Sequence, residues 1–565
     1  MHAIAMRRLG SAAAAVAAAA GSPATSPSAL RAAWRAVRGH VVVPVLQLAV
    51  YVCAAMSLML FLERLYMAAV VAGLWLHRRR RNKRRQHRRR LLAGGEDDDA
   101  WQRVQDEDED LEAAGDDHRC PLVLVQIPMF NERQVYRLSI GAACGLSWPS
   151  DRLVIQVLDD STDPVIRELV EVECARWARK GVCIRYENRS NRSGYKAGAM
   201  REGLRKPYAR CCEFVAIFDA DFQPDADFLR RALPPLLRDP GVALVQARWR
   251  FVNAGDCLLT RIQEMSLNYH FAVEQEAGSA CHAFFGFNGT AGVWRAAALA
   301  DAGGWKERTT VEDMDLAVRA SLRGWRFVYV GDLGVRNELP STFKAYRYQQ
   351  HRWSCGPANL FRKVTPEILR SERVSPWKKL HILYAFFLVR KVVAHLVTFL
   401  FYCVVIPACV LVQGDVHLPR YVAMYVPAAI TVLNAVCTPR SGHLLVFWIL
   451  FENVMSMHRS KAAIIGLLEA SRANEWVVTD KLGSGKATTA AAVATKKTKK
   501  KQQPVWTREV HVLELVLGAC LLYCAVYDIV FFGQDHFYMY LLLQSAAAFI
   551  VGFGYVGASV PAAPS

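Results

Sequence analysis

Long apolar runs alternate with polar stretches along this chain and mark its candidate membrane spans. The first run covers residues 41–61, and a transmembrane helix needs about 20 consecutive, mostly apolar residues. Four more runs lie toward the C-terminus, at residues 391–411, 420–436, 510–527 and 537–557. The pattern therefore predicts about five membrane-spanning helices, one before and four after a long central region.

The central region, residues 119–364, has a different pattern, in which short β-branched runs alternate with amphipathic stretches. Five of these runs are typical of buried strands: LVLVQIPMF, RLVIQVLDD, CIRYENR, CEFVAIFDAD and VALVQARWRF. Between the second and third, Asp163 and Pro164 are placed to cap the start of a helix. Strands that alternate with helices favour a mostly parallel sheet, so we expect an α/β domain inserted between the membrane helices.

Changes in composition set the boundaries of the other segments. The expected segments are a disordered tail (1–38), a first transmembrane and interfacial segment (39–76), a basic and then acidic linker (77–118), an interfacial helix with two transmembrane helices (365–436), a cytoplasmic region with a Lys-rich insert (437–506), and two transmembrane helices with a tail (507–565). The tail is predicted because residues 1–38 are rich in Ala, Ser and Arg and contain no Asp or Glu.

Two basic blocks carry most of the excess behind the formal charge of +19. An arginine block at 77–90 follows the first span, and a lysine block at 496–503 precedes the fourth. Basic residues beside spans favour the cytoplasmic side and contact anionic lipid headgroups. The charge pattern therefore places the α/β domain in the cytosol, with a lumenal site as the alternative. It favours membrane lipids over nucleic acid as the partner of these blocks.

Acidic residues end two of the predicted strands. Asp159 and Asp160 end RLVIQVLDD, at the edge where open α/β sheets bind ligands, and a carboxylate there can accept a hydrogen bond from a nucleobase N–H. An Asx turn or helix cap is the alternative for this pair. Asp219 and Asp221 end CEFVAIFDAD and point to the same side of an extended chain, which suits one Mg²⁺ or Mn²⁺ ion. Solvated turn acids are the alternative here.

Two later motifs are also ambiguous when each is taken alone. TTVEDMD contains Asp313, a candidate general base facing an acceptor hydroxyl, or else an ordinary acidic helix start. YQQHRW contains Gln349, Arg352 and Trp353. Arg352 can pair with a diphosphate and Trp353 can stack on a sugar ring, whereas the alternative is a surface helix with a buried Trp.

In this order, and flanked by membrane spans, the four motifs resemble those of family-2 glycosyltransferases that make β-glycans, such as cellulose, chitin and hyaluronan synthases. The resemblance includes EWVVTDKLG, where Trp476, Val478, Thr479 and Lys481 are similar to the gating loop of that family, with Trp where Phe is usual. Longer segments, such as NRSGYKAGAM and FENVMSMHRSKAAIIGLLEA, are similar to the plant cellulose synthase-like A family, the glucomannan 4-β-mannosyltransferases.

The resemblance implies a GT-A-like domain in a multi-pass Golgi membrane protein. The implied activity is processive, inverting synthesis of a β-1,4-mannan or glucomannan backbone from GDP-mannose, with GDP-glucose as a second donor. The implied partners are the nucleotide sugar, the growing β-mannan chain and a divalent cation, Mn²⁺ or Mg²⁺.

The same resemblance assigns roles to individual residues. Asp160 and Asp313 are the implied catalytic pair, with Asp313 removing the acceptor proton. Asp219 and Asp221 are the implied metal ligands. The implied binding residues for the nucleotide sugar and the chain end are Asp159, Asp160, Lys196, Asp219, Asp221, Gln349, Arg352 and Trp353.

Three other functions fit part of the same pattern. A β-1,4-glucan synthase with a glucose donor shares the acidic motifs. A non-processive transferase with a lipid-phosphate acceptor would leave the YQQHRW motif unexplained. A non-enzymatic scaffold, recruiting acidic partners through the basic blocks, would leave the ordered acids unexplained.

Overall fold

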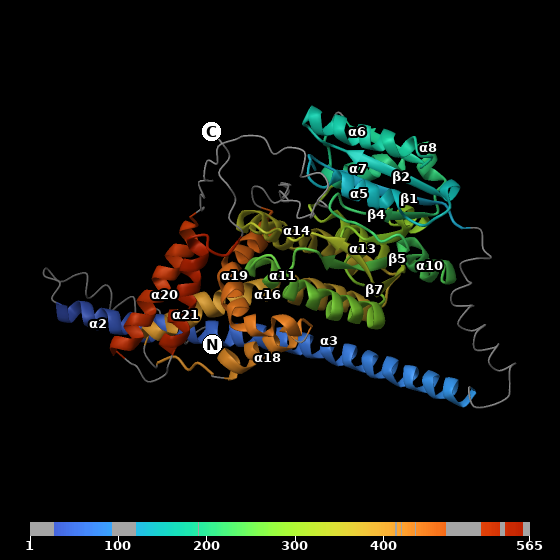
Figure 1. The fold of residues 1–565 in the computed structure, drawn as a ribbon. Coiled ribbons are helices and arrows are strands. Elements are labelled where there is room, and N and C mark those ends of the chain that lie inside the picture. The colour runs from blue at the N-terminus through green and yellow to red at the C-terminus, as the bar shows by residue number, and fades with distance from the viewer. Residues whose placement is uncertain are drawn as a thin grey trace.

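The computed structural model describes residues 27–92, 120–189, 191–412, 415–419, 421–435, 437–469, 510–531 and 537–557. One mixed sheet forms the centre of the α/β domain (Figure 1). Its strands are β1 (Val123–Met129), β2 (Leu153–Asp159), β3 (Ile184–Asn188), β4 (Phe214–Ile217), β5 (Val242–Phe251), β6 (Gly292–Arg295) and β7 (Arg326–Asn337), in the order β3-β2-β1-β4-β6-β5-β7.

The sheet confirms the five predicted strands and adds two. The predicted runs correspond to β1 to β5. The short strand β6 lies between β4 and β5 and is antiparallel to both, whereas the other pairs, β1 with β2 and β4, β2 with β3, and β5 with β7, are parallel. The sheet is therefore mixed but mostly parallel, and the carboxyl ends of β1, β2 and β4 lie next to each other.

Helices cover both faces of the sheet, because side chains along each strand alternate between two apolar clusters. On β1, Val123 and Val125 pack with the helices α5 (Tyr136–Cys144) and α6 (Pro164–Ala178). Leu124 faces the other way, toward the helices α7 (Tyr195–Leu204), α13 (Glu312–Leu322) and α14 (Phe343–Arg370). Asp163 caps α6 as predicted, and its side chain accepts a hydrogen bond from the Val165 N–H.

The remaining helical elements of the α/β domain are short. They are η2 (Ser150–Arg152), α8 (Pro207–Arg210), α9 (Phe228–Ala232), α10 (Pro234–Arg238), α11 (Leu258–Tyr269), η3 (His270–Gln275), η4 (Gly278–His282) and α12 (Ala296–Asp301). The helix α14 joins this domain to the apolar helices, since it packs against both η5 (His381–Val393) and α19 (Leu445–Leu468), as Figure 1 also shows.

Three helical segments, Arg31–Arg84, Pro376–Val412 and Val512–Phe531, are long and apolar enough to cross a membrane. The helices Val426–Ala435 and Phe537–Gly552 are apolar but shorter. These five segments overlap the five predicted runs. Since two of them are short, membrane-spanning character is supported, while the five-span arrangement stays a prediction.

The remaining helical elements, which include those of the apolar segments, lie before and after the α/β domain in the chain. They are α2 (Pro27–Val37), η1 (Arg38–Val42), α3 (Val43–Leu92), α15 (Pro376–Leu380), η5, α16 (Ala394–Phe399), η6 (Leu400–Val405), α17 (Ile406–Val412), η7 (Tyr421–Tyr425), α18 (Val426–Ala435), η8 (Pro439–Leu444), α19, α20 (Val512–Phe531) and α21 (Phe537–Gly552).

Two predicted boundaries need correction at the N-terminal end. The expected disordered tail contains the helix α2, and the expected linker at 77–118 begins inside α3, which runs to Leu92. Ala, Leu and Arg are strong helix formers, and extending an existing helix avoids the cost of a new nucleus. The arginine block therefore continues the first apolar helix (Figure 1).

Candidate active site

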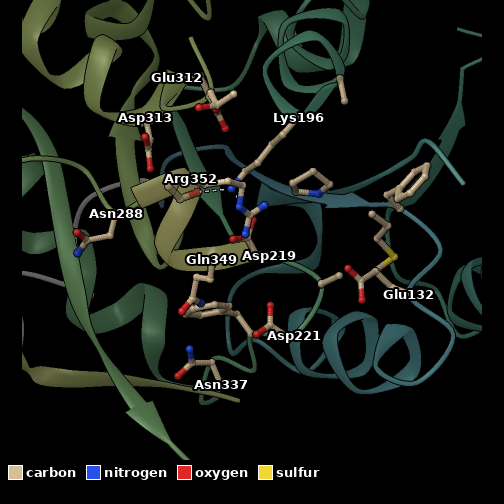
Figure 2. A pocket seen from close by; sticks show the side chains of 18 of the residues that line it. Glu132, Lys196, Asp219, Asp221, Asn288, Glu312, Asp313, Asn337, Gln349 and Arg352 are labelled. Atoms are coloured by element: carbon tan, nitrogen blue, oxygen red, sulfur yellow. Dashed lines mark hydrogen bonds and ion pairs between the residues drawn. The ribbon is translucent and has the colours of Figure 1, made fainter. Parts of the chain in front are cut away.

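A large cavity opens where the carboxyl ends of β1, β2 and β4 meet α13 and α14. The empty space inside it is about 1340 Å³ when the open solvent at its mouth is included. Most of the predicted site residues line it together: Asp160, Lys196, Asp219, Asp221, Asp313, Gln349, Arg352 and Trp353. Figure 2 shows how Lys196, Asp219, Asp221, Asp313, Gln349 and Arg352 converge from separate elements.

Lys196, in the first turn of α7, fixes the first acid of the D-x-D motif. Its Nζ lies 2.5 Å from Asp219 Oδ1 and donates to the Gly289 carbonyl oxygen at 2.8 Å. Burial opposes the charge on Lys196, but the carboxylates of Asp219, Glu312 and Asp313 outweigh it and raise the pKa of the ammonium. Asp219 itself is held by its backbone N–H, which donates to Thr290 Oγ1. Lys196 is therefore a charged part of the cavity wall.

The D-x-D motif fits a divalent cation. Asp219 and Asp221 both line the cavity. Within the described part of the chain, no cluster of three or more His, Cys, Asp or Glu side chains could enclose a metal ion. Mg²⁺ and Mn²⁺ favour one or two carboxylates completed by phosphate oxygens. The donor set therefore fits a cation that is shared with a phosphorylated ligand.

Asp313 begins α13 and faces the cavity close to the Lys196–Asp219 pair. Its Oδ1 accepts a hydrogen bond of 2.7 Å from the Met314 N–H. Gly289 has a φ of +80°, and a Cβ there would lie 2.7 Å from Asp313 Oδ2, so glycine is what lets this carboxylate fit. Burial raises the pKa of Asp313 to about 6, against the opposing effect of the Lys196 ammonium. A carboxylate with this pKa suits a general base.

Glu312 lies beside Asp313 and is almost fully buried. Burial, followed by the charge on Asp313, raises the pKa of Glu312 to about 8. Burial therefore favours the protonated form of Glu312 beside a more readily ionised Asp313.

The residues of YQQHRW reach the cavity from one face of α14. Gln349, Arg352 and Trp353 stand three and four positions apart, which places them on the same side of a helix. Burial lowers the pKa of Arg352, and the carboxylates of Glu312, Asp219 and Asp313 oppose this. Arg352 therefore stands among the cavity acids, as Figure 2 shows.

Asp159 lies under the cavity and is absent from the described residues that line it. Its side chain is fully buried, where Oδ2 accepts from the Tyr186 hydroxyl and Oδ1 from the Ser161 N–H, both at 2.9 Å. In the structure Asp159 therefore contacts Tyr186 and Ser161 rather than the cavity, and direct binding of the nucleotide sugar by Asp159 stays a prediction. Asp160 is the member of the pair that reaches the cavity.

Sequence reasoning missed Arg189, the partner of Asp160. Arg189 Nε donates to Asp160 Oδ1 at 2.7 Å, and Nη2 pairs with Oδ2. The residue follows β3, whose parallel pairing with β2 sets Asn188 opposite Asp159. Because the ends of paired parallel strands meet, an arginine directly after β3 could have been predicted to lie near Asp160.

Sequence reasoning also missed three polar side chains at the opposite end of the cavity: Trp249, Asn288 and Asn337. Each has a buried polar atom without a partner in the described structure, namely Trp249 Nε1, Asn288 Nδ2 and Asn337 Oδ1. Asn288 is held by Gln275, whose amide donates to Asn288 Oδ1 at 3.2 Å. The four gating-loop residues predicted at 476–481 lie outside the described residues.

Two glycosyltransferase family models match the part of the chain that contains the mixed sheet and the acidic motifs at its carboxyl edge. Residues 124–297 match the family described as glycosyl transferase family 2, and residues 214–434 match glycosyl transferase family group 2. The sequence relatives extend this match to nearly the whole chain.

Glucomannan 4-beta-mannosyltransferase 1 of Cyamopsis tetragonoloba is 59% identical over 541 residues, which cover 96% of this chain and 98% of the relative. The enzyme of the same name from Oryza sativa subsp. japonica is 60% identical, with 94% and 97% of the two chains covered. Glucomannan 4-beta-mannosyltransferase 9 of Arabidopsis thaliana is 60% identical, covering 93% and 94%. The chain belongs to the glucomannan 4-β-mannosyltransferase family of family-2 glycosyltransferases, which confirms the resemblance seen in its motifs.

One solved structure also overlaps this chain, the mannosyltransferase PcManGT from Pyrobaculum calidifontis in complex with GDP-Man and Mn²⁺. It is 19% identical and has a TM-score of 0.43, covering 73% of this chain and 99% of the other. An overlap this loose has no bearing on the ligands of the present chain.

Proposed function

We propose that this chain is a processive, inverting synthase of the β-1,4-mannan or glucomannan backbone that uses GDP-mannose, with GDP-glucose as a second donor. The observation that carries the proposal is that Asp313, with its raised pKa, shares one cavity with the D-x-D carboxylates and the cations Lys196 and Arg352. The names of the relatives, glucomannan 4-beta-mannosyltransferases, favour a mannose donor over the glucose donor of a glucan synthase.

The donor binds through charge in this proposal. Asp160 accepts hydrogen bonds from the nucleobase, at the end of β2. Asp219 and Asp221 hold the divalent cation, which when bound offsets the charge that builds up on the leaving diphosphate. Lys196 and Arg352 stand beside these carboxylates and pair with the remaining phosphate oxygens.

Asp313 acts as the general base. Its carboxylate takes the proton from the acceptor 4-hydroxyl while that oxygen bonds to the anomeric carbon of the donor. On the opposite face, the bond from the anomeric carbon to the diphosphate oxygen breaks, and the nucleoside diphosphate leaves with the electron pair. One displacement inverts the centre, so an α-linked donor gives a β-linkage.

The end of the growing chain lies over Trp353, with Gln349 as a hydrogen-bond partner. Apolar sugar faces suit an indole ring, and sugar hydroxyls can pair with the unpartnered polar atoms of Trp249, Asn288 and Asn337. Gln349, Asn288 and Asn337 lie on one side of the cavity, away from Glu132 (Figure 2). Their placement supports separate donor and acceptor ends.

The membrane part completes the proposal. We assign one span before and four after the catalytic domain in a Golgi membrane, with the domain on the cytosolic side, because both basic blocks then contact anionic lipid headgroups rather than nucleic acid. The loop with Trp476, Val478, Thr479 and Lys481 closes over the bound donor and excludes water, since hydrolysis would consume the donor.

The test is a polymer assay in membranes. The full chain is expressed in a host without β-mannans, and its membranes receive labelled GDP-mannose with Mn²⁺ or Mg²⁺. We expect label in alcohol-insoluble polymer that endo-β-mannanase releases, from the wild type and not from Asp313→Asn. Glucan made from a glucose donor alone would move the chain to the glucan synthases. No polymer from any donor, with correctly inserted protein, would contradict the proposed function.

A further inference from the structure

The nucleobase end of the cavity contains an arginine that the mechanism above does not use. Asp160, Phe130, Glu132 and Arg192 line this end. In Figure 2, Glu132 lies on the far side of the Lys196–Asp219 pair from Asn288 and Asn337. Phe130 follows β1 directly and Arg192 belongs to the loop between β3 and α7, so both stand at the carboxyl edge of the sheet.

Arg192 lies against two aromatic rings. Its guanidinium carbon lies 3.3 Å from the centroid of the Phe130 ring and 5.1 Å from that of Tyr195. The close contact with Phe130 restricts the plane of the guanidinium and leaves its N–H edge as the part that can bind a ligand. The side chain is therefore arranged for recognition in the plane of the guanidinium.

One hydrogen-bond donor of Arg192 is unfilled. Its Nε is buried without a partner among the residues that the structure describes. Arg189, three positions earlier, is the opposite case, because it pairs with Asp160 and donates to the carbonyl oxygens of Ser193 and Tyr195. Arg189 holds the loop together, whereas a buried Nε–H in Arg192 costs free energy until a ligand accepts from it.

The neighbours of Arg192 favour a base over a phosphate as that ligand. Asp160 is the carboxylate that acts most strongly on Arg192, whose pKa burial lowers. The phosphate-binding cations, Lys196 and Arg352, stand instead beside Asp219. Arg192 is thus associated with the residue that accepts from the nucleobase.

Guanine fits this pair of side chains. It presents two adjacent acceptors, O6 and N7, which arginine contacts in a bidentate manner. Its N1–H and N2 amino group are donors that a carboxylate accepts. Adenine has an amino donor in place of O6, and uracil lacks the two-acceptor edge, so neither base satisfies both side chains.

We infer that Arg192 binds the O6 and N7 atoms of a guanine base while Asp160 accepts from its N1–H and amino group, and that Phe130 is a positioning residue for Arg192. The selectivity of the site for guanosine diphosphate over other nucleoside diphosphates follows from this pair. The inference rests on the proposed function for the location of the donor, and it adds the residue that selects the base.

The test measures nucleotide binding rather than polymer. The full chain, purified in detergent with Mn²⁺, is titrated with GDP, IDP, ADP and UDP. For the wild type we expect GDP and IDP to bind well, since both carry O6 and N7, and ADP and UDP to bind at least about tenfold more weakly. IDP lacks the amino group and should bind several-fold more weakly than GDP.

Arg192→Met should weaken GDP and IDP binding by roughly ten- to a hundredfold, the loss expected for one bidentate base contact, while ADP and UDP change less than about threefold. Arg192→Lys, which keeps the positive charge but loses the planar bidentate guanidinium, should show most of the same loss of selectivity. Phe130→Ala should shift the GDP-to-ADP ratio in the same direction by a smaller factor. Arg179→Met, at an exposed arginine that directly follows α6, is the matched control and should leave the ratio unchanged.

An equal loss for all four nucleotides in the Arg192 variants would show that Arg192 binds the shared diphosphate, and would overturn the inference. So would a wild type that binds ADP as tightly as GDP. If Arg192→Met does not fold, Arg192→Lys decides the question alone. Because binding is measured without transfer, a failure of polymer synthesis in the assay of the proposed function leaves this result readable.

Discussion

Two aspartates in the first turn of α13, Asp313 and Asp315, stand two residues apart and have opposite surroundings. Asp315 is fully buried between two guanidinium groups: Oδ1 accepts from Arg308 Nε and Oδ2 from Arg319 Nε, each at 2.9 Å. Arg308 also pairs with Glu367 on α14. Asp313 instead faces a cavity, with a backbone N–H at Oδ1 and a raised pKa.

The difference between these surroundings shows how one acidic motif supplies both a structural and a catalytic aspartate. The charge of Asp315 is neutralised by neighbours that tie α13 to α14, so it supports the fold. The charge of Asp313 is only partly offset by the Lys196 ammonium, so its carboxylate is left able to take a proton. The sequence motif EDMD contains both aspartates, and nothing in the motif itself tells which one is catalytic and which one is structural.

The largest expected effect on the fold comes from Asp315→Asn. Removing one partner from a buried ion pair costs about 3–5 kcal/mol, because Arg319 is left buried without its counter-charge. The thermal midpoint of the detergent-solubilised chain should fall clearly below that of the wild type. Asp313→Asn, the matched control in the same turn, should keep the wild-type midpoint. Equal midpoints for all three proteins would remove the structural role of Asp315.

The pH dependence of catalysis should report the raised pKa of Asp313. A base must be deprotonated, so kcat/KM should fall on the acidic side, by about tenfold per pH unit below the pKa of about 6. An unperturbed aspartate would place this limb near pH 4. The measurement is initial rate against pH at low donor concentration. An acidic limb that is absent above pH 5 would exclude Asp313 as a base with this pKa.

Lys196→Met tests whether the Lys196 ammonium acts on Asp313 and not on Asp315. The Lys196 ammonium lowers the pKa of Asp313, so its loss should move the acidic limb to higher pH, by about one unit. Asp315, which has its own two arginines, should be unaffected. A limb that moves to lower pH would mean that Lys196 does not act on the base.

The smallest effect is expected for Asp159→Asn. Asp159 orders Tyr186 and Ser161 under the cavity, so the change should cost about 1 kcal/mol of stability. The KM for the donor should stay within about threefold of the wild-type value, since no contact with the ligand is lost. An increase in KM above about tenfold would restore Asp159 to direct binding.

The fold was predictable where hydrophobic pattern decides it. Runs that become β1 to β5 are continuous and β-branched, as buried parallel strands require. The strand β6 has only four residues, and β7 contains Gly331 and Gly334, so neither has a clear pattern. The charge of the arginine block predicts a linker, but the high helix propensity of its residues extends α3 through it instead.

The site was predictable where motifs follow strands or share a helix face. Asp219, Asp313 and Arg352 meet in the cavity because β4, α13 and α14 end or pass there. The roles of Asp159 and Arg189 were not predictable from adjacency, because they depend on which way each side chain turns and which partner it finds. Pairing of strands in space, rather than spacing along the chain, sets these contacts.

The most direct test of Asp313 as the base compares donor binding with sugar transfer in a single variant. Purified Asp313→Asn, with Mn²⁺, is titrated with GDP-mannose and then given a mannan oligosaccharide as acceptor. The account predicts a dissociation constant within about threefold of the wild-type value and transfer reduced by about 10²–10⁴-fold. Transfer near the wild-type rate, or loss of binding in parallel with transfer, would contradict it.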